Sequence, residues 1–171
     1  MTRVTFETSH GAFVADLDDD AVPRTVTNFL NYAREGVYRG NLFHRVIEGF
    51  VVQGGGFDAR MHEQPARAPI VNEAANARSN TRGTLAMART RDPHSASRQF
   101  FVNVADNDFL DHQSATDAGY GYCTFGEVVE GMETVDAIAG LPTTVVEGHT
   151  DVPREPVTIE RVIIHDDPAT P

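Results

Sequence analysis

The chain has 171 residues, the length of one ordinary domain, and 40% of them are hydrophobic while 23% are charged. This balance supports a buried core and excludes a disordered chain, and the sequence has no run of 18 or more apolar residues that would predict a membrane span. The net charge of −11 excludes the basic surface expected of a nucleic-acid-binding protein.

An alternating pattern opens the chain. Val4 and Phe6 alternate with polar residues, and a second alternating run covers residues 12–17. Ser9, His10 and Gly11 lie between the two runs. This arrangement predicts a β-hairpin over the first 17 residues.

The next segment carries one apolar stripe with helical spacing. The stripe consists of Val22, Val26, Phe29, Leu30, Ala33 and Val37. Pro23 suits the first helical turn, where its missing N–H costs nothing, and Gly36 suits the position just after a helix. We predict a helix from Pro23 to Glu35.

Two further segments have the composition of strands, residues 43–56 and residues 97–104. Between them, residues 57–82 show no sustained period. A loop of this length inside a compact domain is usually functional.

The spacing of apolar residues from 132 to 139 predicts a second, short helix that ends at Gly140, and residues 156–164 have the pattern of a closing strand. We expect residues 1–165 to form a single domain and residues 166–171 a short frayed tail. Because strands dominate and the two helices stand apart, the pattern favours a mainly β fold, one closed antiparallel β-barrel with helices over its open ends.

The first strand-like segment brings a cation and an amide close to apolar groups. In an extended chain Phe43 and Arg45 share one face, opposite His44, and Val51 and Gln53 likewise share a face. Such groups can converge on a binding site. The alternative is an ordinary core strand with a solvated Arg.

The second segment has one apolar face, which suits a barrel interior. Its other face carries Gln99, Phe101 and Asn103, an aromatic residue between two amides. This combination is unusual for a solvent-facing surface and resembles a ligand surface, to which residues 109–110 add apolar groups. The alternative is a single, incidentally exposed Phe.

Five motifs, taken in this order, resemble the cyclophilin family of peptidyl-prolyl cis/trans isomerases. They are Phe43-His44-Arg45, Phe50 with Gln53-Gly54-Gly55, Met87-Ala88-Arg89, Ser97-Arg98-Gln99-Phe100-Phe101 and Phe125-Gly126-Glu127-Val128. The similarity extends from the strand at Val4 to the strand at Ile164. The run from Asn80 to Thr90 and Gly121-Tyr122-Cys123 are most similar to the short cytosolic bacterial cyclophilins.

The resemblance implies an eight-stranded antiparallel barrel with a helix capping each end, a groove that binds Xaa-Pro segments, and no cofactor or metal. It implies that the catalytic residues are Arg45, Phe50, Gln53 and Phe101. It implies that the substrate-binding residues are Val51, Ala88, Arg89, Gln99, Phe109, Leu110 and Tyr122. In this assignment Arg45 approaches the proline amide, and Gln53 hydrogen-bonds the substrate backbone.

Four positions depart from frequent family patterns. Phe109 stands where many eukaryotic members carry Trp, whose indole N–H helps to bind cyclosporin, so we expect weak binding of that drug. Tyr122 replaces a frequent His, Arg89 a frequent Asn and Val51 a frequent Met. The Arg–Phe–Gln set remains, so we expect catalysis to be retained with an altered sequence preference.

Other kinds of site find less support in the sequence. The seven His residues form no tight metal-binding spacing, and we expect His44 to make a local hydrogen bond. Cys123 lies in a strand-like run, where a thiol usually behaves as a small hydrophobe. No Lys follows the glycines 54–56, so they predict a crowded turn rather than a phosphate loop.

The rival from a different class is a proline-peptide binding module or chaperone whose isomerase activity is incidental. Arg45 favours catalysis, because binding alone needs no donor at the amide nitrogen. A single cysteine and an N-terminus without a signal-like apolar stretch favour a cytoplasmic protein. The acidic surface favours a monomer that binds neither nucleic acid nor membrane. The absence of Lys fits either a GC-rich genome or a salt-adapted host.

Overall fold

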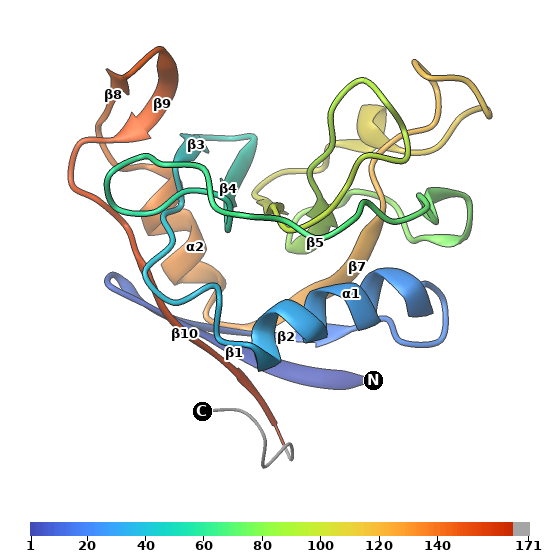
Figure 1. The fold of residues 1–171 in the computed structure, drawn as a ribbon, viewed down its shortest axis with the longest axis horizontal. Coiled ribbons are helices and arrows are strands. Elements are labelled where there is room, and N and C mark those ends of the chain that lie inside the picture. The colour runs from blue at the N-terminus through green and yellow to red at the C-terminus, as the bar shows by residue number, and fades with distance from the viewer. Residues whose placement is uncertain (166–171) are drawn as a thin grey trace.

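The computed structural model describes residues 1–165, and the expected frayed tail lies outside the described residues. An eight-stranded antiparallel sheet dominates it (Figure 1). Its strands are β1 (Thr2–Thr8), β2 (Gly11–Leu17), β3 (Arg45–Ile47), β4 (Val51–Gly54), β5 (Thr84–Met87), β6 (Phe100–Asn103), β7 (Thr124–Glu130) and β10 (Ile159–Ile164). They are arranged in the order β10-β1-β2-β7-β5-β6-β4-β3. A separate hairpin of β8 (Thr143–Val146) and β9 (His149–Pro153) stands at the top left of Figure 1.

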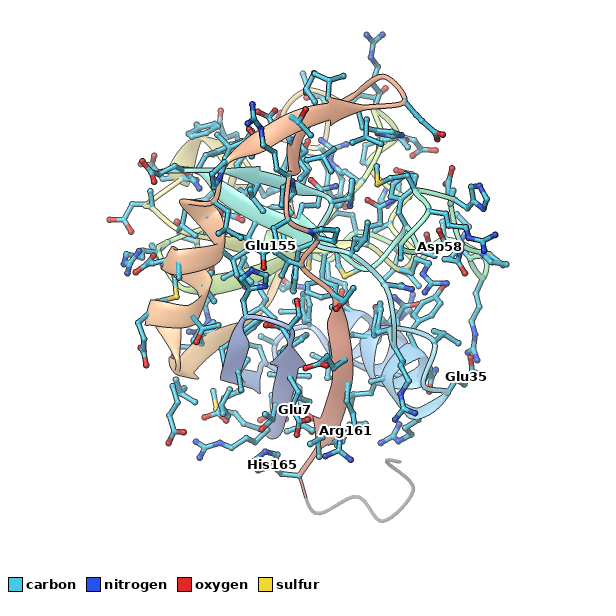
Figure 2. All side chains as sticks on the ribbon, turned by 90° about the vertical axis from the view of Figure 1, so that its left-hand side faces the viewer. Glu7, Glu35, Asp58, Glu155, Arg161 and His165 are labelled. Atoms are coloured by element: carbon cyan, nitrogen blue, oxygen red, sulfur yellow. The ribbon has the colours of Figure 1, made fainter. Side chains whose placement is uncertain are left out.

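The predicted opening hairpin and closing strand are both confirmed. β1 pairs with β2 and also with β10, so the strands that come first and last in the sequence lie side by side (Figure 1). The register places Phe6 opposite Phe13, and their rings stack at 4.6 Å. On the outer face Arg161 and Glu7 form an ion pair of 3.1 Å between β10 and β1 (Figure 2).

The predicted apolar stripe forms one side of helix α1 (Pro23–Arg34), as expected. Phe29 is completely buried, and its ring contacts those of Phe6, Phe100 and Phe125. Burial of one such aromatic side chain contributes about 2–3 kcal/mol. The chain leaves the helix through Gly36 at φ 69°, a left-handed conformation that favours glycine.

The second predicted helix is also present, as α2 (Met132–Ala139) with Gly140 as its C-cap residue. It packs near β2, β3 and β4, whereas α1 lies against the inner aromatic residues. Two short 3-10 turns, Ala74–Asn76 and Asp108–Leu110, complete the described structure.

The mainly β class is confirmed, but strand pairing does not fully close the barrel. β3 and β10 are the two ends of the sheet order and do not pair with each other. An irregular segment bridges the gap, because the N–H of Gly40 donates to the carbonyl of Ile159 at 2.8 Å and that of Phe43 to Val157 at 2.9 Å. The sheet is therefore strongly curled, with residues 40–43 acting as the seam.

One predicted strand face is wrong for the same reason. Phe43 and Val46 both lie in the main core, while Arg45 is only partly buried. The strand begins at Arg45 and Phe43 belongs to the irregular seam, so strict alternation does not extend back to Phe43.

The long loop at residues 57–82 is confirmed as largely irregular, and the buried Arg98 ties it to the barrel. The Arg98 guanidinium donates to the carbonyls of Gly55, Pro65 and Val37 at 2.7–2.9 Å. It also donates to the side-chain oxygen of Asn41 at 2.8 Å. A buried cation needs such compensation, so one side chain joins three separate segments.

Candidate active site

A groove with a volume of about 360 Å³ opens beside β4 and β6. It is lined by Arg45, Phe50, Val51, Gln53, Ala88, Arg89, Phe101, Leu110 and Tyr122. All nine belong to the eleven site residues expected from the sequence. The structure thus brings together residues from positions 45 to 122 around one cavity, with Gln99 and Phe109 outside its lining.

The strand register explains this convergence. β3 pairs with β4 so that Arg45 lies opposite Gln53, and β4 pairs with β6 so that Gln53 lies opposite Phe101. Residues that lie directly opposite each other in antiparallel strands project from the same face. The predicted shared face of Val51 and Gln53 is confirmed, since both side chains line the groove.

A short chain of hydrogen bonds fixes the polar side of the groove. Arg45 Nη1 donates to Gln53 Oε1 at 3.1 Å, and Gln53 Nε2 donates to Gln99 Oε1 at 3.1 Å. Gln99 therefore restricts the orientation of the Gln53 amide. It needs Gly56 to do so, because a Cβ at Gly56 would lie 2.4 Å from the Gln99 amide. The expectation that these glycines relieve crowding is confirmed at this position.

The apolar side of the groove is a small core of its own. Val51, Ala86 and Phe101 are buried together, and Phe50 and Leu110 pack against them. A ring the size of proline would meet hydrocarbon and aromatic surface here, and little water. Contacts made by Arg45 inside such a site are stronger than in open solvent.

Phe109 occupies a different position from the other aromatic residues. Its side chain is 63% exposed, and its ring stacks on that of Phe50 with centroids 5.9 Å apart. It thus extends one wall of the groove outward.

Buried amides beneath the groove were missed as supporting residues in the sequence. Asn103 was expected on the ligand surface, but it is fully buried. Its side chain donates to Asn80 and to Thr84, both at 3.0 Å, and accepts from Asn107 at 2.9 Å. Asn107 also donates to the carbonyl of Phe50 at 3.0 Å. These bonds hold the backbone of Phe50, which belongs to the apolar wall of the groove, and they can be recognised only in the folded structure.

Asp111 anchors the other end of this buried network. Its carboxylate accepts from Ser79 Oγ and, at 2.7 Å, from the backbone N–H of Asn80. Burial alone would raise the pKa of Asp111, but the hydrogen bonds from Asn80 and Ser79 outweigh it and hold the pKa below its ordinary value. Asp111 follows Leu110 directly, so an ionised carboxylate positions a groove residue.

The family assignment can now be tested against known proteins. The sequence model described as "Cyclophilin type peptidyl-prolyl cis-trans isomerase/CLD" matches residues 3–164. This chain belongs to the cyclophilin family. The fold class and activity that the resemblance implied are confirmed, and this cyclophilin is a peptidyl-prolyl cis-trans isomerase.

Relatives of this cyclophilin cover almost its whole length. Peptidyl-prolyl cis-trans isomerase B of Escherichia coli (strain K12) is 55% identical over 161 residues, 94% of this chain and 98% of the relative. Peptidyl-prolyl cis-trans isomerase cyp18 of Streptomyces antibioticus is 53% identical over 160 residues, 94% of this chain and 96% of the relative.

A solved structure shares the fold. The cyclophilin type peptidyl-prolyl cis-trans isomerase of Cryptosporidium parvum, crystallised in the presence of the dipeptide Ala-Pro, has a TM-score of 0.74 at 24% sequence identity. The match covers 96% of this chain and 99% of that one. Among residues 1–165, no helix is both long and apolar enough to cross a bilayer.

Proposed function

We propose that the groove binds Xaa-Pro segments of peptides and proteins, with the proline ring against Phe50, Phe101 and Leu110 and the Arg45 guanidinium at the proline amide. The observation that carries this proposal is the register of β3, β4 and β6, which sets a cation and an amide beside an apolar pocket. Rotation about the peptide bond then proceeds in a site that holds one side of that bond fixed.

The chemistry needs a donor and an anchor. An Xaa-Pro amide resists rotation by roughly 18–20 kcal/mol, because the nitrogen lone pair is delocalised into the carbonyl. At the twisted transition state the nitrogen becomes pyramidal and regains this lone pair. A donor aimed at it binds the transition state more tightly than either planar form, and this difference lowers the barrier.

Arg45 has the properties of such a donor. A guanidinium is always charged, presents several N–H groups in a rigid fork, and has no acceptor that would compete. One of its nitrogens is bonded to Gln53, which restricts its orientation and leaves other N–H groups for the substrate. No covalent bond breaks, so the step requires neither a nucleophile nor an acid–base pair.

Gln53 and the segment 88–89 complete the peptide site in this proposal. Gln53 uses one N–H on Gln99, and its second N–H hydrogen-bonds the substrate backbone. Ala88 and Arg89 follow β5 and offer main-chain groups to the peptide. Tyr122 and Phe109 flank the groove, and Gln99 orients its polar wall.

The decisive experiment is NMR exchange on a peptide with a single Ala-Pro bond, comparing the wild type with Arg45→Ala. Uncatalysed exchange takes tens to hundreds of seconds. We expect rapid exchange with the wild type and a loss of about 10²–10³-fold in the variant, the cost typical of a missing transition-state donor. Peptide binding, measured by titration in the same samples, should change by only a few fold.

The matched control is Arg24→Ala, which removes the same charge from the exposed surface of α1. It should exchange as fast as the wild type. Binding without accelerated exchange in the wild type would favour the alternative function, a proline-peptide binding module or chaperone. Fast exchange in Arg45→Ala would contradict the role of Arg45.

The remaining expectations belong to the same proposal. We treat residues 1–165 as one isomerase domain, which the family match over residues 3–164 supports. We propose a cytoplasmic monomer, since the single Cys123 is buried and unpaired and the chain is strongly acidic. Sedimentation and cell fractionation test these two points.

A further inference from the structure

A second hollow adjoins the substrate groove. It has a volume of about 610 Å³ and is lined by Arg89, Thr90, Arg91, Asp117, Ala118 and Tyr122. Arg89 and Tyr122 also line the groove, so the two cavities meet at this pair. Consecutive residues of a peptide are about 3.8 Å apart, so a peptide with its proline in the groove has this side hollow within reach of another residue.

The Arg89 guanidinium lies at the junction of the two cavities. It sits 4.9 Å from the centre of the Tyr122 ring. Its Nη1 donates to the carbonyls of Thr90 and Arg91, and its Nη2 to that of Asp117, each at 3.3 Å. These bonds are long for N–H···O contacts. Its Nε is buried and has no hydrogen-bond partner in the part of the chain that the structure describes.

The cations at this junction are not neutralised by carboxylates. Ion pairs with Asp or Glu hold some of the other arginines, namely Arg3, Arg67, Arg78, Arg82 and Arg161. None of the ion pairs found within residues 1–165 includes Arg45, Arg89 or Arg91. With 25 acidic residues against 14 Arg, a shortage of carboxylates does not explain this.

We propose that the side hollow is a specificity subsite for an acidic side chain of the substrate, and that Arg89, with Arg91 beside it, is the residue that selects it. The inference rests on the proposed function, because it requires the proline to occupy the neighbouring groove. It assigns a role to the Arg89 side chain in addition to the main-chain role proposed above.

A carboxylate suits Arg89 for two reasons. Charge-assisted bonds from a guanidinium to a carboxylate are shorter and stronger than bonds to neutral carbonyls, so the ligand displaces the three long contacts at a net gain. A small rotation of the fork also brings the unpartnered Nε into such a pair, which removes the cost of a buried donor without an acceptor. Stacking on Tyr122 limits the conformational freedom that is lost on binding. Asp117, the one acid in the lining, contacts Arg89 through its backbone carbonyl.

The test uses acetylated and amidated peptides, so that only one residue is charged. Each peptide has one proline, with Glu or its neutral isostere Gln at one of three positions on either side. NMR exchange gives kcat/KM, and titration gives Kd. We expect the wild type to favour Glu over Gln about fivefold at one position, the effect of a partly exposed ion pair. The ratio should fall to about one in Arg89→Met and in the wild type at high salt.

The Glu/Gln ratio is taken within each protein, so a general loss of activity in Arg89→Met does not affect it. Arg24→Met removes the same charge from α1 and should retain the wild-type ratio. A wild-type ratio near one at every position, or an unchanged ratio in Arg89→Met, would overturn the inference. Equal acceleration of both peptides leaves the proposed role of the groove intact, whereas tighter Glu binding without acceleration of exchange supports the subsite and contradicts the proposal that the groove catalyses the rotation.

Discussion

Phe109, at the outer edge of the groove, is the most exposed of the eleven expected site residues, and it offers only hydrocarbon and a π-face to a ligand. Its ring stacks on Phe50 and extends the apolar wall of the groove outward. A Trp at this position would add an indole N–H, the donor that the family resemblance associates with cyclosporin. We therefore expect this cyclophilin to bind cyclosporin weakly, because Phe109 cannot donate the hydrogen bond that an indole N–H would supply.

We expect Phe109→Trp to bind cyclosporin at least fivefold more tightly than the wild type, since one hydrogen bond contributes about 1 kcal/mol. Inhibition of peptide exchange measures this affinity. Phe109→Tyr is the matched control, because it keeps the stacking and places its donor at a different point. Equal inhibition of the wild type and Phe109→Trp would show that the missing indole is not the reason for weak binding.

His44, next to Arg45, is buried, and its Nδ1 atom has no hydrogen-bond partner within residues 1–165. The Nδ1 atom therefore does not make the local hydrogen bond expected of His44, and the ring packs on Phe57 at 4.6 Å. Burial, and then the nearby His149 and Arg45, lower the pKa of His44 to about 4. The unfolded chain, with an ordinary His pKa of about 6.5, therefore binds more protons than the folded chain between these two values.

Stability should consequently fall as the pH drops from about 6.5 towards 4. At pH 4.5 the loss from His44 alone is about 2 kcal/mol relative to pH 7. Urea unfolding at the two pH values should show a steeper loss in the wild type than in His44→Gln. The other titrating groups contribute equally to both proteins. Parallel pH profiles would contradict the depressed pKa.

Arg98 is one of several residues that attach the long loop at residues 57–82 to the barrel, together with Thr25, Asp18 and Gly121. Arg98 lies two residues before β6 and donates to the carbonyl of Gly55, which precedes the loop, and to that of Pro65 within it. We expect Arg98→Gln to lower the free energy of unfolding by about 2–4 kcal/mol, because it leaves the buried acceptors on Gly55 and Asn41 without their donor and also removes two partly buried hydrogen bonds. We also expect faster proteolytic cleavage within the loop.

Urea unfolding and limited proteolysis measure the two effects of this substitution. Arg98→Lys keeps the charge but loses the fork, and should lie between the wild type and Arg98→Gln. Arg24→Gln on α1 controls for the loss of one positive charge. A change below about 0.5 kcal/mol, the range of ordinary surface substitutions, would contradict the role given to Arg98.

The elements that the sequence reveals are those with a sustained period. α1 was predictable because six apolar residues repeat at helical spacing, and β1 and β2 because one face of each strand is buried. The hairpin of β8 and β9 was not predicted. Its strands are mostly partly buried or exposed, so they carry no alternation of apolar and polar residues.

The site was predictable in part and for different reasons. Alternation alone placed Val51 and Gln53 on one face, whereas the roles of the eleven residues came from the family resemblance. Spacing could not show that Phe43 lies in an irregular seam, because the start of a strand depends on its partners. It also could not show that Asn103 meets Asn80 and Asn107 under the groove, since those contacts form only in three dimensions.

The whole molecule carries an excess of negative charge, and this affects its stability as well as its partners. A net charge of −11 on a small domain creates self-repulsion in the folded state. Salt screens this repulsion over a Debye length of about 10 Å at 0.1 M. The surface ion pairs that salt also weakens contribute little, each about 0–1 kcal/mol.

We therefore expect the melting temperature to rise by a few degrees when NaCl increases from 0.05 to 0.5 M, which corresponds to less than about 1 kcal/mol. Differential scanning calorimetry measures it. A fall in the melting temperature would mean that ion pairs outweigh the repulsion. A rise that continues into molar salt would favour a salt-adapted host over a GC-rich genome as the reason for the absence of Lys.

The pairing of β1 with β10 also has a consequence for synthesis on the ribosome. The seven-residue strand β1 leaves the ribosome well before its partner at residues 159–164. At about 5–20 residues per second, that partner follows many seconds later. One edge of the nascent sheet therefore stays open until residues 159–164 have been made, and a chain that stops before residue 159 exposes the β1 edge to neighbouring nascent chains.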